Sequence, residues 1–192
     1  MLFRSPAEQM PGTVIRPYPS QYVVPWITQN GDTLTIRPIR PEDEPLLVWF
    51  HQALSERSVF LRYFQQLQLA QRVAHERLTR ICFIDYDREM ALVAERRSAS
   101  GQPEILGVGR LSKLHGANEA EVAFLVSDQF QQHGLGTELL RRLIQVARDE
   151  KVQRIVGYVL PENRLMRRVF EKLGFRLAPE PREALLRAEL QL

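Results

Sequence analysis

The sequence has a single cysteine, Cys82, among its 192 residues, and its four histidines are scattered along the chain. One cysteine excludes an intramolecular disulfide, and no group of cysteine and histidine residues has the spacing of a metal site. We therefore expect no bound metal, and a chain kept in the reducing cytoplasm.

Long hydrophobic runs and a strong net charge are also absent. No stretch of about 18 apolar residues occurs, and the first residues lack the apolar segment of a signal peptide, so we expect no membrane anchor. The net charge is only +3. This small excess suits an anionic ligand, an acidic partner or nucleic acid equally, so charge alone excludes none of them.

What is present is the composition of a folded globular domain, with 44% apolar and 26% charged residues. Five of the twelve prolines lie within the first 25 residues, where neither helical nor strand periodicity is found. We predict a linker or N-terminal arm over residues 1–24 and one domain over residues 25–192.

Hydrophobic periodicity predicts an α+β (mixed α/β) domain. A hairpin is expected over 22–40, because Asn30 and Gly31 suit the φ > 0 positions of a tight turn. Pro41 and the three acidic residues after it favour the start of the first helix. Helices are predicted over 40–54, 55–64, 70–82, 131–150 and 162–174, and strands over 89–97, 104–114, 119–128, 154–160 and 175–178. The tail over 183–192 fits a last strand, which we favour, or a short helix. Helix 131–150 then crosses over between two parallel strands.

Two glycines, Gly134 and Gly136, stand at the first turn of the helix predicted over 131–150. Glycine costs about 1 kcal/mol relative to alanine inside a helix, so this pair requires a reason. The first turn of a helix has unpaired N–H groups and the positive end of the helix dipole, and it binds anions. Without Cβ atoms at these positions, a phosphate group can approach the N–H groups of residues 132–137.

Two familiar phosphate-binding loops do not fit this stretch. A Walker loop needs Gly-Lys before Ser or Thr, and Gly136 is followed by Thr137. A dinucleotide fingerprint needs a third glycine where Leu139 stands. Gln131, Gly134 and Gly136 do match the pattern Gln/Arg-x-x-Gly-x-Gly/Ala between a strand and a helix, which resembles the coenzyme A pyrophosphate loop of the GNAT acetyltransferase superfamily.

The resemblance covers residues 33–192. "LTIRPIRPEDEPLL" (34–47) is similar to the opening strand and helix of the superfamily, and "ENRLMRRVFEKLGF" (162–175) is similar to its Asn-x-x-x-x-x-x-Tyr-x-x-x-Gly-Phe ending. It implies a mostly antiparallel twisted sheet of about seven strands with a splayed parallel pair, flanked by helices. It also implies acetyl-CoA as the cosubstrate.

Further stretches, "RPYPSQY", "SERSVFLRYF" and "FIDYDREMALVA", resemble one branch of the superfamily. This branch is the catalytic domain of bacterial protein lysine acetyltransferases, which follows a region like an NDP-forming acyl-CoA synthetase. The resemblance implies transfer of acetyl to the ε-amine of a protein lysine, typically on the AMP-forming acetyl-CoA synthetase, which is thereby inactivated. It implies neither a nucleic acid nor a membrane as partner. The Pro-Tyr-Pro segment is then the remnant of a longer chain or the arm of a lone domain.

The acceptor needs a base, since a lysine with a pKa of about 10.4 must lose its proton before it attacks a thioester. The period of two in strand 119–128 places Glu119 and Glu121 on one face. Glu121 lies further inside the strand and matches the general-base glutamate of the superfamily. Glu119 is the second candidate, about 7 Å along the strand. Both also fit solvated charges on a sheet edge.

The other site residues follow from the same resemblance. A backbone N–H near Leu125 or Val126 is expected to stabilise the tetrahedral intermediate. Asn163 either contacts the coenzyme or caps its helix. Phe170 replaces a tyrosine acid and cannot donate a proton, but a thiol with a pKa of about 8.5 leaves without one. The predicted coenzyme loop consists of Gln131, Gln132, His133, Gly134, Leu135, Gly136 and Thr137.

Some assignments stay open. Four arginines are candidates for binding the 3′-phosphate of the coenzyme: Arg141, Arg142, Arg167 and Arg168. Of these, we include Arg168 in the predicted site. Six residues shape the acceptor side or simply pack: Tyr63, Phe64, Asp85, Tyr86, Asp87 and Arg88.

Two other functions fit the sequence. The same fold could acetylate a small amine, which predicts a deep acidic acceptor pocket, or it could be a non-catalytic module that senses coenzyme A.

Overall fold

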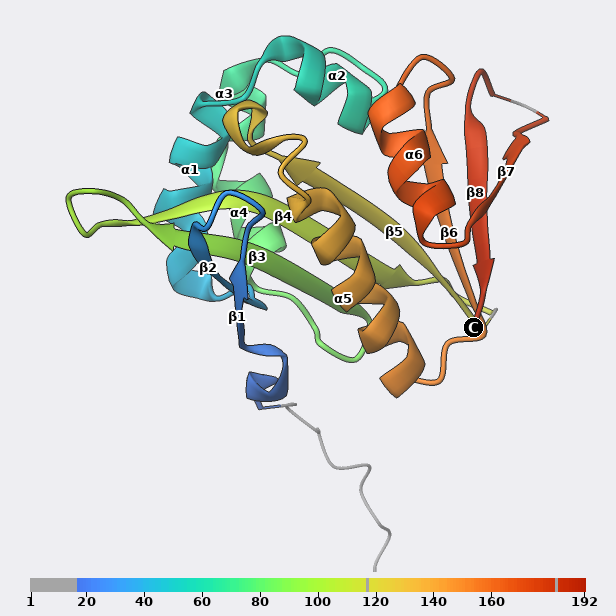
Figure 1. The fold of residues 1–192 in the computed structure, drawn as a ribbon, viewed down its shortest axis with the longest axis horizontal. Helices are drawn as coiled ribbons and strands as arrows, with labels where there is room; N and C mark the ends of the chain where they lie inside the picture. Colours follow the sequence, from blue (N-terminus) through green and yellow to red (C-terminus); the bar gives the residue numbers. More distant parts are fainter. Residues whose placement is uncertain (1–16, 117, 182) are drawn as a thin grey trace, which may run out of the picture.

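The computed structural model describes residues 17–116, 118–181 and 183–192 (Figure 1). Residues 1–16 of the predicted arm lie outside these residues. The described end of the arm packs on the domain: Tyr18 donates its hydroxyl hydrogen to the carbonyl of Pro38 at 2.9 Å, and Tyr22 packs against the core. The boundary at residue 25 stays a prediction.

One sheet of eight strands forms within the described residues, in the order β1-β2-β3-β4-β5-β6-β8-β7. Of the strand pairs that the structure describes, β5 and β6 alone are parallel. The strands are β1 Val24–Ile27, β2 Thr33–Pro38, β3 Glu89–Arg97, β4 Pro103–Lys113, β5 Glu119–Val126, β6 Arg154–Val159, β7 Arg176–Pro179 and β8 Leu186–Gln191. The predicted fold class is confirmed. The resemblance implied about seven strands, whereas eight form, and the tail is β8, which lies between β6 and β7.

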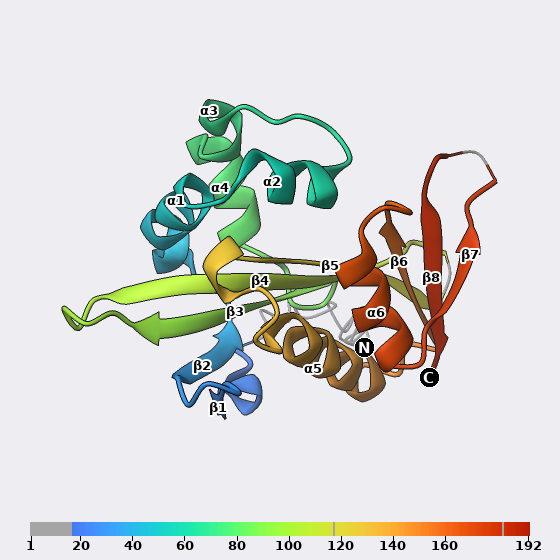
Figure 2. The ribbon, with the colours of Figure 1, turned by 45° about the horizontal axis from the view of Figure 1, so that its top comes forward.

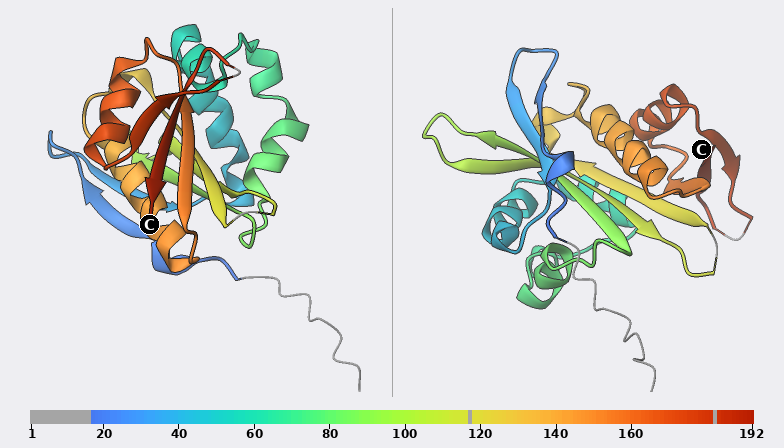
Figure 3. Two further views of the ribbon diagram at one scale, coloured as in Figure 1. Left: turned by 90° about the vertical axis from the view of Figure 1, so that its right-hand side faces the viewer. Right: turned by 90° about the horizontal axis from the view of Figure 1, so that it is seen from below.

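The helices cover both faces of the sheet (Figures 2 and 3). They are α1 Glu44–Gln52, α2 Glu56–Tyr63, α3 Leu69–Arg72, α4 His75–Cys82, α5 Leu135–Asp149 and α6 Arg164–Lys172, with 3-10 turns at Ser20–Tyr22, Pro41–Asp43 and Asp128–Phe130. Helices α5 and α6 pack with one core cluster, and α1, α2 and α4 pack with another. Strand β3 separates the two clusters, with Leu92 in one and Val93 in the other. This explains its continuous apolar run.

Helix α5 is the crossover connection predicted between β5 and β6. Leu135, Leu139, Leu143 and Val146 form one row on it, and each is at most 1% exposed. Burial of such a side chain stabilises the fold by about 2 kcal/mol, so this row fixes α5 on the sheet. The position of its first turn is thereby fixed as well.

Two helix predictions need correction. The helix predicted over 70–82 is two helices, α3 and α4, because Ala74 is extended at ψ 130° and Arg72 is 2% exposed, bonded to the carbonyl of His51. The first helix begins as a 3-10 turn at Pro41, and α1 starts at Glu44. Asp43 there does more than complement a dipole: it is buried and forms an ion pair with Arg37 at 2.6 Å.

The parallel pair opens into a fork. Its register ends at the partners Glu121 and Val156, and beyond them the two strands diverge, as Figure 1 shows. The splayed pair predicted from the resemblance is confirmed. Because the fork leaves one edge of β5 unpaired from Val122 onward, backbone groups of β5 are available to a ligand.

Candidate active site

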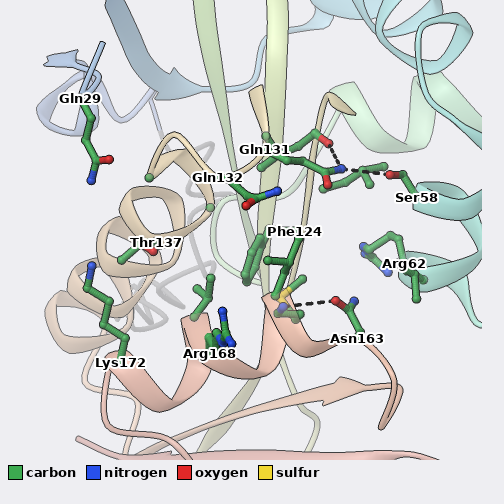
Figure 4. A pocket seen from close by; sticks show the side chains of 18 residues that line it. Gln29, Ser58, Arg62, Phe124, Gln131, Gln132, Thr137, Asn163, Arg168 and Lys172 are labelled. Atoms are coloured by element: carbon green, nitrogen blue, oxygen red, sulfur yellow. Dashed lines mark hydrogen bonds between the residues drawn. The ribbon is translucent and has the colours of Figure 1, made fainter. Parts of the chain in front are cut away.

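A cavity of about 320 Å³ lies beside the open end of the fork, where β5, α5 and α6 meet α2 (Figure 4). Many of the predicted coenzyme residues line it: Leu125, Val126, Gln131, Gln132, Gly134, Gly136, Thr137, Asn163 and Arg168. Two do not, since Leu135 is 1% exposed in the core and the His133 ring packs edge-on against Phe130. For these two, only the backbone N–H groups remain as candidates.

The loop before α5 presents its backbone to this cavity. Gln132 and Gly134 have left-handed φ angles of 64° and 86°. Gly134 is the N-cap of α5, and no side chain of the described residues caps the helix. The first i to i−4 bond runs from the Glu138 N–H to the Gly134 carbonyl. The N–H groups of residues 135–137 therefore have no such acceptor within the helix. The arrangement is an open helix N-terminus that suits an anion.

The two glycines have different structural reasons. Gly134 is needed for its positive φ, because a Cβ there would meet nothing nearer than 3.8 Å. Gly136 is needed for close packing, since its Cβ would lie 3.2 Å from the Phe124 ring. Because neither residue has a Cβ atom, the loop lies close to β5 and its N–H groups stay uncovered.

Hydrogen bonds join this loop to α2. Gln131 donates from Nε2 to Ser58 Oγ at 3.0 Å and to the Val126 carbonyl at 3.2 Å. Asp128 accepts from the Ser55 hydroxyl at 2.6 Å and the Ser58 hydroxyl at 2.8 Å. Burial raises the pKa of Asp128, but these hydrogen bonds outweigh it and hold that pKa below its ordinary value. We call Ser55, Ser58, Asp128 and Gln131 the serine link.

Helix α6 forms the opposite wall of the cavity. Asn163 caps it, because its side-chain oxygen accepts from the Met166 N–H at 3.2 Å (Figure 4). The same residue lines the cavity, so the two predicted roles of Asn163 are compatible. Arg168 and Lys172 add positive charge at the exposed end of this wall.

The other predicted phosphate ligands are engaged elsewhere. Arg141 and Arg142 both form ion pairs with Glu138 on their own helix, and neither lines the cavity. Arg167 donates to the Pro161 carbonyl at 3.0 Å. Among the four arginines, only Arg168 is positioned at the cavity.

Sequence reasoning missed several lining residues: Gln29, Ser58, Leu61, Arg62, Phe124, Leu165, Met166, Val169 and Lys172. A signal existed for α6, because Leu165, Arg168, Val169 and Lys172 follow the i, i+3, i+4, i+7 spacing of one helix face. No local signal existed for Gln29, which reaches the cavity from the β1–β2 turn.

The two candidate bases have different surroundings. Glu119 is held by ion pairs with Arg154 and, at 3.9 Å, Arg187. Glu121 is exposed, makes no ion pair within the described residues, and lies at the apex of the fork. It lines a small second cavity together with Arg62 and Tyr158. Glu121 is therefore the carboxylate that remains available to a substrate.

The directions of the backbone groups on β5 distinguish between the two predicted N–H donors, those of Leu125 and Val126. Ser127 donates its N–H to the Leu106 carbonyl of β4 at 2.8 Å, and neighbouring strand residues point their backbone groups to opposite sides. The N–H and carbonyl of Val126 therefore point away from β4, and the carbonyl accepts there from Gln131. The Val126 N–H thus points into the fork. Leu125 faces β4 instead, with its carbonyl 3.4 Å from the position of a Cβ on Gly107. Of the two predicted N–H groups, Val126 has the suitable direction.

The residues predicted on the acceptor side divide into two groups. Phe64 lines the cavity of Glu121, and Tyr63 lines a further cavity beneath α1, α2 and α4. Tyr86 instead donates to the Ile39 carbonyl at 2.8 Å, and Arg88 pairs with Asp85 at 3.8 Å. Asp87 accompanies them in the turn before β3, where its N–H donates to Asp85 at 3.0 Å.

Other kinds of site find no support in the described part of the chain. No group of three or more histidine, cysteine or acidic residues there is placed to hold a metal ion. Cys82 is 2% exposed, and burial raises its pKa to about 12, so it is no thiolate nucleophile. Across the described helices, none is both long and apolar enough to cross a bilayer.

Comparison with known proteins identifies the family. The family profile described as "Acetyltransferase (GNAT) domain" matches residues 33–176, well over half of the chain, so the chain belongs to the GNAT acetyltransferase family. Its predicted activity as an N-acetyltransferase is confirmed at this level.

Individual relatives point to one branch of this family. The chain is 29% identical over 168 residues to Acetyltransferase Pat of Mycolicibacterium smegmatis. The aligned residues make up 88% of this chain and 47% of that protein. It is 30% identical over 146 residues to Acetyltransferase PA5475 of Pseudomonas aeruginosa, 76% of each. The crystal structure of the GNAT domain of S. lividans PAT superposes with a TM-score of 0.81 at 28% identity, over 92% of this chain and 100% of that one.

These relatives confirm the predicted closeness to the catalytic domains of bacterial Pat-type acetyltransferases. The chain spans about half the length of the curated Pat protein that it matches.

Proposed function

We propose that this chain transfers the acetyl group of acetyl-CoA to the ε-amine of a lysine on a protein, and that an AMP-forming acetyl-CoA synthetase is such a protein. The observation that carries the proposal is the continuous path from the uncapped N-terminus of α5, along the free edge of β5, to Glu121. Likeness to the S. lividans PAT domain supports a protein acceptor.

The cavity fits the coenzyme in chemistry. A pyrophosphate needs N–H donors without side chains in the way, and the loop around Gly134 and Gly136 offers them. The pantetheine arm needs an apolar wall with exposed strand groups, which Val126 and Val169 supply. Arg168 and Lys172 suit the remaining phosphate.

Glu121 would act on the acceptor. It accepts a proton from the lysine ammonium, and the amine nitrogen then attacks the thioester carbon to form a C–N bond. The Val126 N–H, directed into the fork, would stabilise the negative charge on the carbonyl oxygen. The C–S bond then breaks, the nitrogen gives up its second proton to leave a neutral amide, and the thiolate takes up a proton.

Phe170 lines the same small cavity but cannot supply that last proton, because its ring carries no acidic hydrogen. Tyr158 lines the same small cavity as Glu121 and carries a phenol, so it is the candidate acid. A leaving thiol with a pKa of about 8.5 makes such an acid helpful rather than essential. We place the reaction in the cytoplasm, where Cys82 would remain reduced.

The test is to incubate the chain with labelled acetyl-CoA and an AMP-forming acetyl-CoA synthetase, with Glu121→Gln as the matched control. We expect label on one lysine of the synthetase, and loss of synthetase activity in proportion. Label no greater than in the control, together with thiol release by small amines, would contradict a protein acceptor. Coenzyme binding without turnover on any amine would indicate a sensing module instead.

A further inference from the structure

A third cavity, which we call the basic cavity, lies between the sheet and helices α1, α2 and α4. It has a volume of about 60 Å³, and its polar lining consists of His51, Arg62, Tyr63, Arg77 and Arg110. Apolar side chains form the rest of the wall. Arg62, Tyr63 and Arg77 are half-buried, so the cavity is reached from the surface.

The basic cavity is next to Glu121. Arg62 and Ala123 line both this cavity and the smaller cavity of Glu121. Glu121, Ala123 and Leu125 share one face of β5 by alternation, so Glu121 and Ala123 are about 7 Å apart along the strand. At this distance, one substrate can place its amine at Glu121 and a second chemical group in the basic cavity over Ala123.

Positive charge in the cavity exceeds negative charge. Arg110 forms an ion pair with Glu89, but Arg62 and Arg77 make no ion pair within the described residues. Both stack over the Tyr63 ring, at 4.9 Å and 5.0 Å from its centre. The buried Nε atom of Arg77 has no hydrogen-bond partner among the residues that the structure describes.

The positive charges around Arg62 affect its pKa, as expected for a cluster of like charges. Burial lowers the pKa of Arg62, and the positive charges of Arg110 and Arg77 lower it further, against an opposite effect of Tyr63 and Glu121. Arg62 is thus close to two other guanidinium groups, and Glu121 is the carboxylate that opposes their effect on its pKa.

His51 completes the cavity as a neutral donor. It is 3% exposed, and its Nδ1 has no hydrogen-bond partner in the described part of the chain. Burial, with the positive charges of Arg77, Arg72 and Arg62, lowers its pKa to about 4, so the ring is uncharged at neutral pH. A buried N–H or nitrogen without a partner is costly, and an anion that accepts from the ring would remove that cost.

These contacts define the ligand chemistry. Guanidinium forks match the two oxygens of a carboxylate, and the small volume admits a group of few atoms rather than a nucleotide. The same charges repel a polyamine, and the cavity is the opposite of the acidic pocket that a cationic small amine would need.

We propose that the basic cavity binds the carboxylate of an aspartate or glutamate that flanks the acceptor lysine, and so selects lysines with an acidic neighbour. The proposal rests on the proposed protein acceptor. Its chemistry would also fit the α-carboxylate of a free amino acid, and the experiment has an arm for each source.

The experiment measures KM for blocked peptides that contain one lysine and one glutamate, moved through the nearby positions, each matched by a glutamine peptide. A second pair, Nα-acetyl-lysine and its amide, tests the free α-carboxylate. We expect a glutamate peptide to have a KM lower by roughly tenfold or more than its glutamine partner, because charge-assisted hydrogen bonds are strong. The preference should shrink in Arg77→Gln and persist in Arg80→Gln, an exposed arginine of the same helix.

The outcomes separate this proposal from the proposed function. Peptides that are acetylated without any preference for glutamate would overturn the carboxylate site and leave the protein acceptor standing. Preference for Nα-acetyl-lysine over its amide, with no peptide acetylated, would overturn the flanking acid and the protein acceptor together. A preference that Arg77→Gln leaves intact would show that the basic cavity does not cause it. The comparison of peptides on the unaltered chain holds even if the variant fails to fold.

Discussion

The two faces of the sheet build their sites from different materials. On the face covered by α5 and α6, which we call the loop side, the cavity wall is made of backbone N–H groups and nearby apolar side chains. On the face covered by α1–α4, which we call the arginine side, Arg62 and Arg77 come from separate short helices and meet over Tyr63. Main-chain geometry makes the first site, and long side chains brought together by packing make the second.

Glu121 lies where the two sides meet. The fork places it at the end of the parallel pairing, and the serine link ties the loop side to α2 on the arginine side through Gln131 and Ser58. Neither face forms the proposed site by itself, because the coenzyme cavity and the basic cavity meet at residues that line both, Arg62 of α2 and Leu125 of β5.

The largest expected effect is at this junction. Glu121→Gln removes the proton acceptor while keeping the shape of the side chain, so kcat should fall by about 10² to 10⁴-fold. Binding of coenzyme A to the loop side should not change. Steady-state kinetics with a saturating acceptor, together with calorimetric titration of coenzyme A, measures the two separately.

Glu119→Gln is the matched control on the same face of β5. It breaks the partly exposed ion pairs with Arg154 and Arg187, which should lower the free energy of unfolding by about 1 kcal/mol or less with little loss of kcat. If Glu119→Gln lost turnover and Glu121→Gln kept it, the assignment of the base would be reversed.

The loop side could be predicted from the sequence because its parts are neighbours in the chain. Gln131, Gly134 and Gly136 are a few residues apart, and a strand and a helix with clear periods flank them. Lys172 was missed although its spacing from Arg168 puts both on one face of α6.

The arginine side could not be predicted in the same way. His51, Arg62 and Arg77 are far apart in the sequence and meet only after α1, α2 and α4 have packed on β4 and β5. Arg141 and Arg142 show the converse: they follow the coenzyme loop closely, yet Glu138 on the same helix takes both. Nearness in sequence predicts backbone features well, but the partners of an arginine depend on tertiary packing.

A second prediction concerns stability on the arginine side. The pKa of His51 falls from 6.5 to about 4 on folding, so between these values the unfolded chain binds more protons. The stabilisation is complete above pH 6.5 and is lost as the pH drops from 6.5 toward 4. We expect the free energy of unfolding to fall by about 2 kcal/mol from pH 7 to pH 5, measured by urea titration at each pH.

His51→Gln should flatten this dependence, since glutamine does not titrate. His75 contributes in the opposite sense, because its hydrogen bond with Glu44 raises its pKa, and it is present in both proteins. An equal slope in both would mean that burial and the positive charges of Arg77, Arg72 and Arg62 do not hold the ring neutral.

The smallest expected effect comes from two glycine-to-alanine substitutions. Their comparison separates the cost of backbone strain from the loss of coenzyme contact on the loop side. Gly134 and Gly101 both have a left-handed backbone, with φ of 86° and 79°, and a Cβ would clash with nothing at either position. Alanine at either should therefore cost about 1 kcal/mol of stability, from the left-handed conformation alone. Only Gly134 lies at the cavity, so relief of this strain should displace the loop N–H groups and weaken coenzyme A binding several-fold in Gly134→Ala but not in Gly101→Ala. Equal dissociation constants for the two variants, at equal loss of stability, would mean that the N–H groups around Gly134 do not hold the pyrophosphate.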